Sequence, residues 1–521
     1  MKIHHYTLIL ISLLFAASCS KDIGVYEYHD INELKISGVA STINLRRTLD
    51  TLHLNPTIDA TLDDGDINRY SYAWVLSSGP KIFDTIGREK NLHYPILLNP
   101  GPYNLYYRVL DKKTGIKGMS NITLNVSTAF SRGLLIMGED EEGYAEAEML
   151  SMLNDTIHFK HLLSESGLPR LREPVNFFHT GGTYDPYIKL WVNTKTQSYY
   201  LDRVTLKSTP ANTFSRLIYA SESIDQATLH PVVIAPQVMQ ANGYNTSSGG
   251  SSYRVILTKA GDIFACYLAI NGGDFYTNPV NKASDAPSVR LVAAPYLLYP
   301  INNMSSFMWY DIKNQRFLNY TSLGSTNPAA VLTDKDDGTE PFPWNQAKTG
   351  RKLVYAENTR AVESGYANGI SFAIMKNAAN VHYVYKFYAN GSAPARIGAY
   401  TISSIATNFD KADFYAFSSN RTVIFYSVGN RLYAYDYNPG KERVYEFPSI
   451  GNDPITMLKF DTQINYATNS LYIATYNSST KGTLRRFIVG SNPNVVELLP
   501  QENSTWTNMV KIKDINWRGL N

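Results

Sequence analysis

The fold is decided most clearly by the stretch TVIFYSVGNRLYAYD, which covers residues 422–436. Apolar and aromatic residues recur on both sides of the central Val428-Gly429-Asn430. Alternation with a period of two residues is typical of a β-strand, and Gly and Asn between two such runs favour a tight turn. The sequence therefore predicts a β-hairpin here, with tyrosines at alternating positions.

Similar runs recur along residues 129–521, at a loose spacing of about 55 residues. They form seven β-rich blocks: Gly133–Gly138; Ile188–Val192 with Ser198–Leu201; Tyr253–Thr258 with Ile263–Leu268; Phe307–Asp311 with Arg316–Tyr320; Ile370–Met375 with Val381–Tyr388; Thr422–Ser427 with Arg431–Asp436; and Ser470–Tyr476 with Leu484–Val489. A last run, Met509–Lys513, has no partner after it. Pairing it with Leu134–Met137 would close a ring and remove the exposed sheet edge. The prediction is an all-β chain whose residues 129–521 form a β-propeller, with seven blades favoured over eight or an irregular ring.

The N-terminus has the pattern of a secretion signal over residues 1–18. Its apolar run of about 11 residues is too short for a transmembrane helix. The run ends in Ala16-Ala17-Ser18-Cys19, small residues before a cysteine that resemble a lipobox. This predicts lipidation of Cys19 and a membrane contact through the lipid alone; the alternative is an ordinary signal peptide with a chance cysteine.

A polar tether, residues 19–30, follows. Within it, Ser20-Lys21-Asp22 resembles the surface-export tag of Bacteroidota lipoproteins. That resemblance implies an outer-membrane protein that faces the cell exterior.

Residues 31–128 contain short alternating runs separated by Gly, Pro, Asn and Asp turns, which is the pattern of a β-sandwich. Trp74 in one run, then Pro100-Gly101-Pro102-Tyr103, resembles a PKD-type immunoglobulin fold. The resemblance implies a core position for Trp74 and a spacer role for the module. The run Asp63-Asp64-Gly65-Asp66 is interpreted as a solvated turn, with calcium binding as the alternative.

The whole chain resembles the PKD-like lipoproteins of Bacteroidota. Besides the lipobox and the Trp74 module, the features that carry this resemblance are Phe130–Ile136, Tyr426–Asp436, Ile455–Phe460 and Tyr472–Tyr476. The resemblance implies a surface lipoprotein that works beside a SusC/SusD-like pair, a TonB-dependent transporter with its lipoprotein lid. It transfers neither a ligand nor a binding residue.

Composition excludes several classes of function. The chain has 521 residues, with 48 Lys and Arg against 45 Asp and Glu, and a net charge of +3 gives no basic footprint for nucleic acid. No metalloprotease, phosphate-loop, nucleophile-elbow or paired Cys motif is present. We therefore expect a non-enzymatic protein without a cofactor or metal. The lone Cys266 is expected to be buried in a strand.

Three polar clusters keep a metal or catalytic alternative open. His158 and His161 would share one face of a helix, Glu139–Glu142 form an acidic loop, and residues 334–340 have a calcium-loop composition with the wrong spacing. A glycan hydrolase or lyase needs only carboxylates that converge in space, so it remains a second hypothesis. A purely structural or adhesive surface protein is the third.

Loop aromatics are the candidate ligand-binding residues. They are Tyr184, Tyr187, Tyr244 and Trp344, each beside Gly, Asn, Asp or Pro. Flat rings can stack on sugar faces or cover peptide side chains, while nearby polar groups fix orientation. The hypothesis is an oligosaccharide or peptide site; for each ring, packing or solvent exposure is the alternative.

Overall fold

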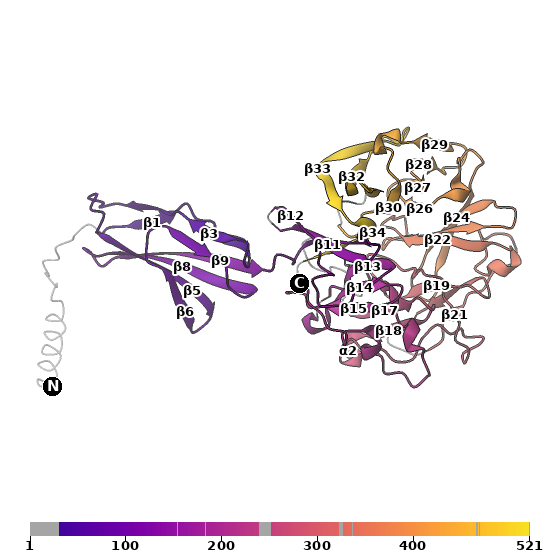
Figure 1. Ribbon diagram of the computed structural model, residues 1–521, viewed down its shortest axis with the longest axis horizontal. Helices are drawn as coiled ribbons and strands as arrows, with labels where there is room; N and C mark the ends of the chain where they lie inside the picture. Colours follow the sequence, from indigo (N-terminus) through magenta and orange to yellow (C-terminus); the bar gives the residue numbers. More distant parts are fainter. Residues whose placement is uncertain are drawn as a thin grey trace, which may run out of the picture. The chain divides into compact units, whose positions relative to one another are not determined.

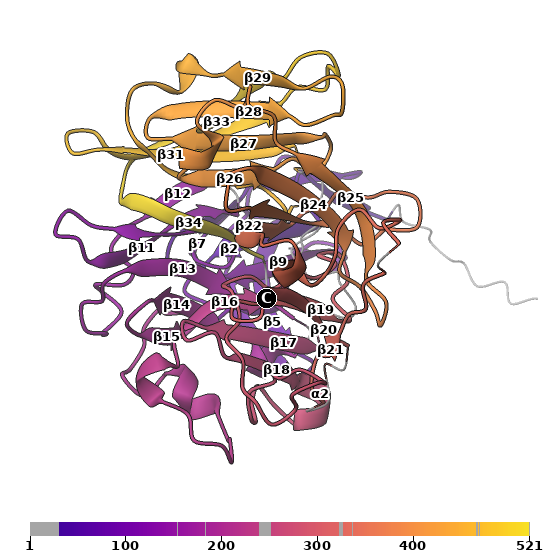
Figure 2. The ribbon, with the colours of Figure 1, turned by 90° about the vertical axis from the view of Figure 1, so that its right-hand side faces the viewer.

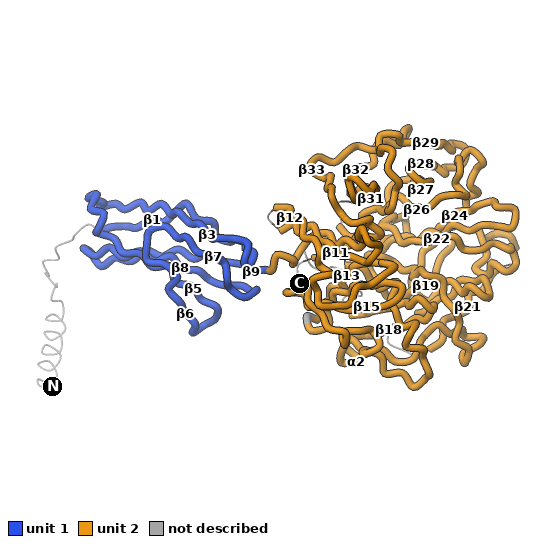
Figure 3. Tube along the Cα trace, viewed as in Figure 1, with its two compact units in different colours: residues 1–127 blue, residues 128–521 orange. Residues whose placement is uncertain are grey.

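The computed structural model describes residues 31–519, apart from 154, 183, 239–251, 322, 324–326, 336, 465–466 and 468. The chain falls into two compact units, residues 1–127 and 128–521 (Figure 3). The regular elements are almost all strands (Figure 1), which confirms the all-β class. None of the helices in the described residues is long and apolar enough to cross a membrane.

The described residues of unit 1, from 31 onward, form a five-stranded sheet, ordered β2-β9-β8-β5-β6, and two strand pairs, β1-β4 and β3-β7. The strands are β1 (Leu34–Ser37), β2 (Thr42–Arg46), β3 (Thr51–Leu54), β4 (Thr57–Ala60), β5 (Tyr70–Gly79), β6 (Ile82–Gly87), β7 (Leu92–Pro95), β8 (Gly101–Asp111) and β9 (Lys117–Ser127). Trp74 is fully buried and stacks on Tyr107, with ring centroids 4.1 Å apart. The predicted core position of Trp74 is confirmed.

A buried ion pair joins three segments of unit 1. Asp111 Oδ2 accepts hydrogen bonds from Arg69 Nη2 and from Asn32 Nδ2, each at 2.8 Å. The Arg69 guanidinium holds the pKa of the Asp111 carboxyl well below its usual range. In the neighbouring acidic turn, Asp64 pairs with Lys113, as expected of a solvated turn.

Unit 2 contains seven antiparallel sheets within its described residues. The first sheet is ordered β12-β11-β10-β34, with β10 (Gly133–Glu139), β11 (Ala145–Met152), β12 (Thr156–Phe159) and β34 (Lys511–Arg518). The second to fourth sheets have three strands each: β13 (Pro174–His179), β14 (Leu190–Thr194) and β15 (Ser198–Leu201); β16 (Pro231–Ala235), β17 (Tyr253–Thr258) and β18 (Ile263–Tyr267); and β19 (Phe307–Asp311), β20 (Arg316–Tyr320) and β21 (Ala330–Val331). The fifth to seventh sheets have four strands each: β22 (Lys352–Asn358), β23 (Ser371–Lys376), β24 (His382–Tyr388) and β25 (Ala395–Thr401); β26 (Phe414–Phe417), β27 (Val423–Val428), β28 (Arg431–Asp436) and β29 (Arg443–Glu446); and β30 (Ile455–Phe460), β31 (Ser470–Asn477), β32 (Lys481–Val489) and β33 (Leu498–Met509). Short helices occur in the connections: η1 (Asp185–Tyr187), η2 (Phe214–Leu217), η3 (Gln226–Thr228), α2 (Leu268–Asn271), η4 (Gln346–Lys348), η5 (Phe409–Lys411) and η6 (Pro448–Ile450).

The hairpin predicted over 422–436 is confirmed as β27 and β28. Tyr426 lies opposite Tyr433, and their rings stack at 5.1 Å. Both faces of these strands are buried, because neighbouring side chains point into two different cores: Phe425 packs toward the seventh sheet and Ile424 toward the fifth.

The last strand of unit 2 pairs with the first. In Figure 1 the yellow β34 lies among the purple strands of the first sheet, and Leu134 is opposite Trp517. The predicted pairing is therefore present, but the predicted strand Met509–Lys513 is wrong in its bounds. Met509 ends β33 and Lys511 begins β34, so the chain passes from the seventh sheet to the first at Val510.

Among the described residues of unit 2, seven apolar clusters connect the sheets, and each cluster is shared by two sheets. They contain Leu135 with Phe177, Phe178 with Phe264, Val255 with Trp309, Met308 with Tyr385, Phe372 with Phe417, Phe425 with Ile473, and Tyr472 with Trp517. Each of the first six clusters joins consecutive sheets, and the last joins the seventh sheet to the first. Figure 2 shows several of these sheets lying face to face.

Candidate functional site

A cavity of about 320 Å³ lies where edge strands of unit 2 meet. Five sheets contribute an edge strand to its wall, namely β16, β22, β26, β30 and β34. The fourth sheet contributes Tyr296 and Leu297, from a segment bridged to β19 through Leu298 and Met308. Six of the seven sheets therefore converge on one cavity, which we call the axial cavity.

Glu357, on β22, is the acidic group of the axial cavity whose protonation is most perturbed. The Tyr355 hydroxyl donates a hydrogen bond to its Oε2, and the Phe417 backbone N–H donates to its Oε1. Burial raises the pKa of Glu357 to about 7, against these two hydrogen bonds and the charge of Lys459, which lower it. Near neutral pH this carboxyl can hold or release a proton.

An ion pair and an amide bridge complete the polar lining. Lys459 Nζ donates to Asp514 Oδ1 at 2.9 Å and to the Ile515 carbonyl at 2.7 Å, which ties β30 to β34. Gln237 Nε2 donates to Thr462 Oγ1 at 3.0 Å, linking segments that follow β16 and β30. Both links fix polar side chains that come from distant parts of the chain.

Aromatic rings lie on the same wall. Tyr296 and Tyr355 contact edge to face, with centroids 5.8 Å apart, and Phe414 also lines the axial cavity. Burial raises the pKa of Tyr296 to about 12, so its hydroxyl stays protonated. Aromatic surface beside amide, hydroxyl and charged groups is the lining that orients a small polar ligand.

The four aromatics singled out in the sequence do not gather in one place. Tyr184 is 39% exposed, and its ring lies 6.2 Å from that of the half-buried Tyr187. The Tyr187 hydroxyl donates to the Gly272 carbonyl at 3.0 Å. Neither residue lines the axial cavity. Cys19 and Tyr244 lie outside the described residues.

Trp344 belongs to the core, which corrects its interpretation as a loop residue open to ligand. It is 2% exposed. Phe342 and Phe387 contact its ring edge to face, and the Arg396 guanidinium lies 4.7 Å from its centroid. With its ring covered in this way, Trp344 has no face left for a ligand.

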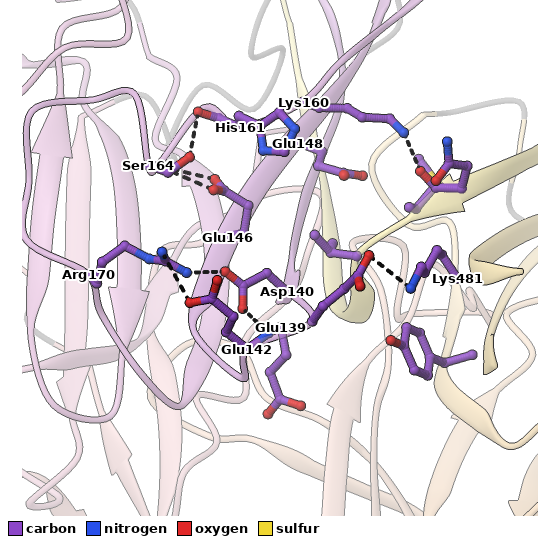
Figure 4. Close-up of a pocket in the computed structure, with 15 residues that line it drawn as sticks. Glu139, Asp140, Glu142, Glu146, Glu148, Lys160, His161, Ser164, Arg170 and Lys481 are labelled. Atoms are coloured by element: carbon purple, nitrogen blue, oxygen red, sulfur yellow. Dashed lines mark hydrogen bonds and ion pairs between the residues drawn. The ribbon is translucent and has the colours of Figure 1, made fainter. Parts of the chain in front are cut away.

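The acidic loop Glu139–Glu142 lines a second pocket, of about 380 Å³ (Figure 4). Its carboxylates face cations: Asp140 and Glu142 pair with Arg170, and Glu141 pairs with Lys481 at 2.9 Å. Deeper in the pocket, Glu146 accepts hydrogen bonds from backbone N–H groups. Partners that already neutralise or bond these carboxylates favour a structural role for the loop.

The two other polar clusters are engaged as well. His158 lies on strand β12, not on a helix, and its Nε2 is 2.9 Å from Glu148 Oε2. Asp334 and Glu340 both pair with Arg396. In the described part of the chain no group of three His, Cys, Asp or Glu side chains is placed to hold a metal ion.

Cys266 is buried in β18, as predicted. Its thiol donates to the Gly273 carbonyl at 3.3 Å, and burial raises its pKa to about 12. A thiol with so little thiolate at neutral pH is chemically inert.

Sequence reasoning missed the axial cavity, because most strands that line it had not been predicted. β16 and β26 have four or five residues, and no tight turn marks them as hairpins. The one available signal was the run Ile455–Phe460, quoted for the family resemblance, which is β30 itself.

Comparison with protein families finds one match, over part of the chain. The PKD-like family matches residues 19–160, which include all the described residues of unit 1 and the first three strands of unit 2. No curated protein matches the sequence.

Among solved structures, a quinonprotein alcohol dehydrogenase-like protein from Bacteroides thetaiotaomicron is 12% identical, with a TM-score of 0.36 over 92% of this chain and 97% of that one. A putative 6-phosphogluconolactonase from Bacteroides uniformis is 10% identical, with a TM-score of 0.41 over 74% and 99%. The SGBP-B protein of the Bacteroides ovatus mixed-linkage glucan utilization locus, in complex with a heptasaccharide, is 10% identical, with a TM-score of 0.16 over 72% and 92%. Similarities at this level of sequence identity and TM-score do not indicate which activity, if any, this chain has.

Proposed function

We propose that this protein is a surface-exposed, lipid-anchored accessory subunit of an outer-membrane nutrient transporter, and that it binds an oligosaccharide or peptide in the axial cavity. The observation that carries the binding role is the convergence of six sheets on one cavity with aromatic, amide and charged groups. Non-enzymatic capture needs only such a lining, without a nucleophile.

In this proposal unit 2 is a seven-bladed β-propeller. Support comes from the seven sheets, the pairing of β10 with β34, and the seven shared clusters, the last of which joins the seventh sheet to the first. A ring of this kind brings one edge strand of each sheet toward a common axis, where ligand sites form.

The anchor and the partner rest on the N-terminus and the family. Ala16-Ala17-Ser18-Cys19 supports lipidation at Cys19, and Ser20-Lys21-Asp22 supports export to the outer surface. The PKD-like match supports unit 1 as a spacer. A SusC/SusD-like transporter pair is the partner proposed.

Binding is tested by calorimetric titration of the soluble chain, residues 20–521, with glycan and peptide panels. A Tyr296→Ala variant removes one ring from the axial cavity, and Tyr219→Ala, at a side chain that is 67% exposed, is the matched control. We expect the first variant to lose affinity at least tenfold and the control to keep it. Equal affinity in both variants would show that the ligand binds outside the axial cavity.

Anchoring and docking are tested in cells. We expect wild-type protein to incorporate labelled palmitate, to be cleaved by external protease and to co-purify with the transporter pair. Cys19→Ala should abolish palmitate incorporation. Labelling that persists in this variant would refute the anchor, and failure to co-purify would refute the partner.

A glycan hydrolase or lyase is the second candidate, and the raised pKa of Glu357 is the observation that favours it. Glu357 and Asp514 line the same axial cavity, so a protonated acid and a paired carboxylate face one space. The test measures turnover of a panel of polysaccharides. Turnover that is lost in Glu357→Gln, but kept in a variant of the exposed Glu502, would establish the hydrolase or lyase function. Ligand binding without turnover would exclude it.

A further inference from the structure

Two buried arginines, Arg254 on β17 and Arg518 at the end of β34, act on His179 at the end of β13, and none of the three lines the axial cavity. Arg254 and Arg518 are 1% and 2% exposed, and His179 is 1% exposed. Burial holds the pKa of the His179 ring well below its usual range, and the charges of Arg518, Arg203 and Arg254 act on the ring in the same direction. Two like charges and a neutral imidazole therefore share one interior region.

These groups keep donor capacity that the described chain does not use. Arg254 gives Nη1 and Nη2 to the carbonyls of Thr180 and Gly181, at 3.0 and 3.2 Å, but its Nε has no partner there. Arg518 gives Nη2 to the Arg203 carbonyl at 2.7 Å, while its Nε and Nη1 have none. Neither ring nitrogen of His179 is bonded within the described residues.

Nearby carboxylates do not neutralise the pair. Asp274 is 3% exposed, but it accepts from the Tyr276 hydroxyl at 2.6 Å and lies 3.5 Å from Lys189 Nζ. The charge of Asp202, at the surface, acts on Arg518 and offsets part of its charge, but this carboxylate accepts its hydrogen bonds from the backbone of its own loop. In the described part of the chain neither Arg254 nor Arg518 forms an ion pair with a carboxylate. A buried charge without a counter-charge is strongly destabilising.

We propose that Arg254, Arg518 and His179 bind a small oxyanion in the interior of unit 2. Guanidinium groups suit this ligand because they stay charged when buried and donate directed hydrogen bonds to phosphate or carboxylate oxygens. The imidazole adds one donor from whichever nitrogen carries its proton. The bound anion supplies the missing counter-charge and holds β13, β17 and β34 together.

The test is equilibrium dialysis of the whole chain against radiolabelled inorganic phosphate. Saturable binding supports the proposal, and no saturable binding overturns it.

Variants tie that binding to the cluster. Arg518→Met and Arg254→Met keep most of the side-chain volume and remove one charge each, and the exposed Arg443→Met is the matched control. Phosphate should raise the Tm of the wild-type chain by roughly 3 °C, and the rise should saturate with phosphate concentration. We expect this rise to vanish in the two cluster variants and to persist in the control. An equal rise in all three would overturn the proposal, even with phosphate bound.

If a Met variant does not fold, Arg518→Lys decides the question. It keeps the charge but loses the Nε and Nη donors, so phosphate affinity should fall at least tenfold while the fold is retained. Unchanged affinity would show that Arg518 does not contact the anion.

Discussion

Replacing Glu357 by Gln should remove a pH-dependent loss of stability from unit 2. The pKa of this carboxyl rises from 4.5 to about 7 on folding, because the axial cavity buries it. Between these values the native state holds a proton that the unfolded chain releases. The native state therefore binds more protons, and the free energy of unfolding falls as pH rises from about 4.5 to about 7.

The magnitude follows from the two pKa values. Proton linkage lowers the free energy of unfolding of the wild type by about 1 kcal/mol at pH 5 and by about 3 kcal/mol at pH 8, relative to a protein whose side chain at this position does not titrate. The Gln variant is neutral at every pH and lacks this slope. It also loses part of the hydrogen bonding from Tyr355 and Phe417, but that offset does not change with pH.

The assay is urea unfolding at pH 5 and pH 8, followed by the fluorescence of the tryptophans in unit 2. Relative to the wild type, Glu357→Gln should gain about 2 kcal/mol in unfolding free energy between the two pH values. Glu502→Gln, at an exposed position of β33, controls for loss of one negative charge. The same wild-type-to-variant difference at both pH values would refute the reasoning, since Glu357 would then titrate as an exposed glutamate.

Three further outcomes test the packing. Trp517→Ala should destabilise unit 2 by about 3–5 kcal/mol, because its ring lies in the apolar cluster shared by the first and seventh sheets. Trp506→Ala, at a half-buried position against the same cluster, should lower the free energy of unfolding by less. Equal losses of unfolding free energy in the two variants would contradict this prediction. Trp74→Ala should cost a similar amount in unit 1, and calorimetry should leave the unit 2 transition in place. In a Cys19→Ala chain, a thiol reagent at pH 8 should modify Cys266 only after denaturation; rapid reaction of folded protein would show an exposed thiol.

The sequence predicted hairpins well because their signals are local. In the stretch 422–436 the alternation and the Gly-Asn turn lie within fifteen residues, and β27 and β28 form there. The structure buries both faces of β27, because a strand between two neighbouring sheets sends alternate side chains into two cores.

The aromatic site hypothesis shows where local signals end. Trp344 follows Pro341-Phe342-Pro343, which is typical of a surface loop, yet this segment folds back onto Phe387. Whether a ring in an irregular segment faces solvent or core depends on residues distant in the chain. Glu357 carried no signal at all, because its pKa is set by burial and by Tyr355 and Phe417 in space.

By itself the sequence determined the all-β class, the core position of Trp74, the buried Cys266 and the pairing of the first and last strands of unit 2. Hydrophobic period and turn chemistry act over a few residues, and an unpaired terminal strand calls for a partner. Only the tertiary structure decided where polar groups meet: the axial cavity around Glu357, and the buried cations Arg254 and Arg518. Electrostatic environments are made by side chains that folding brings together, and spacing along the chain does not encode them.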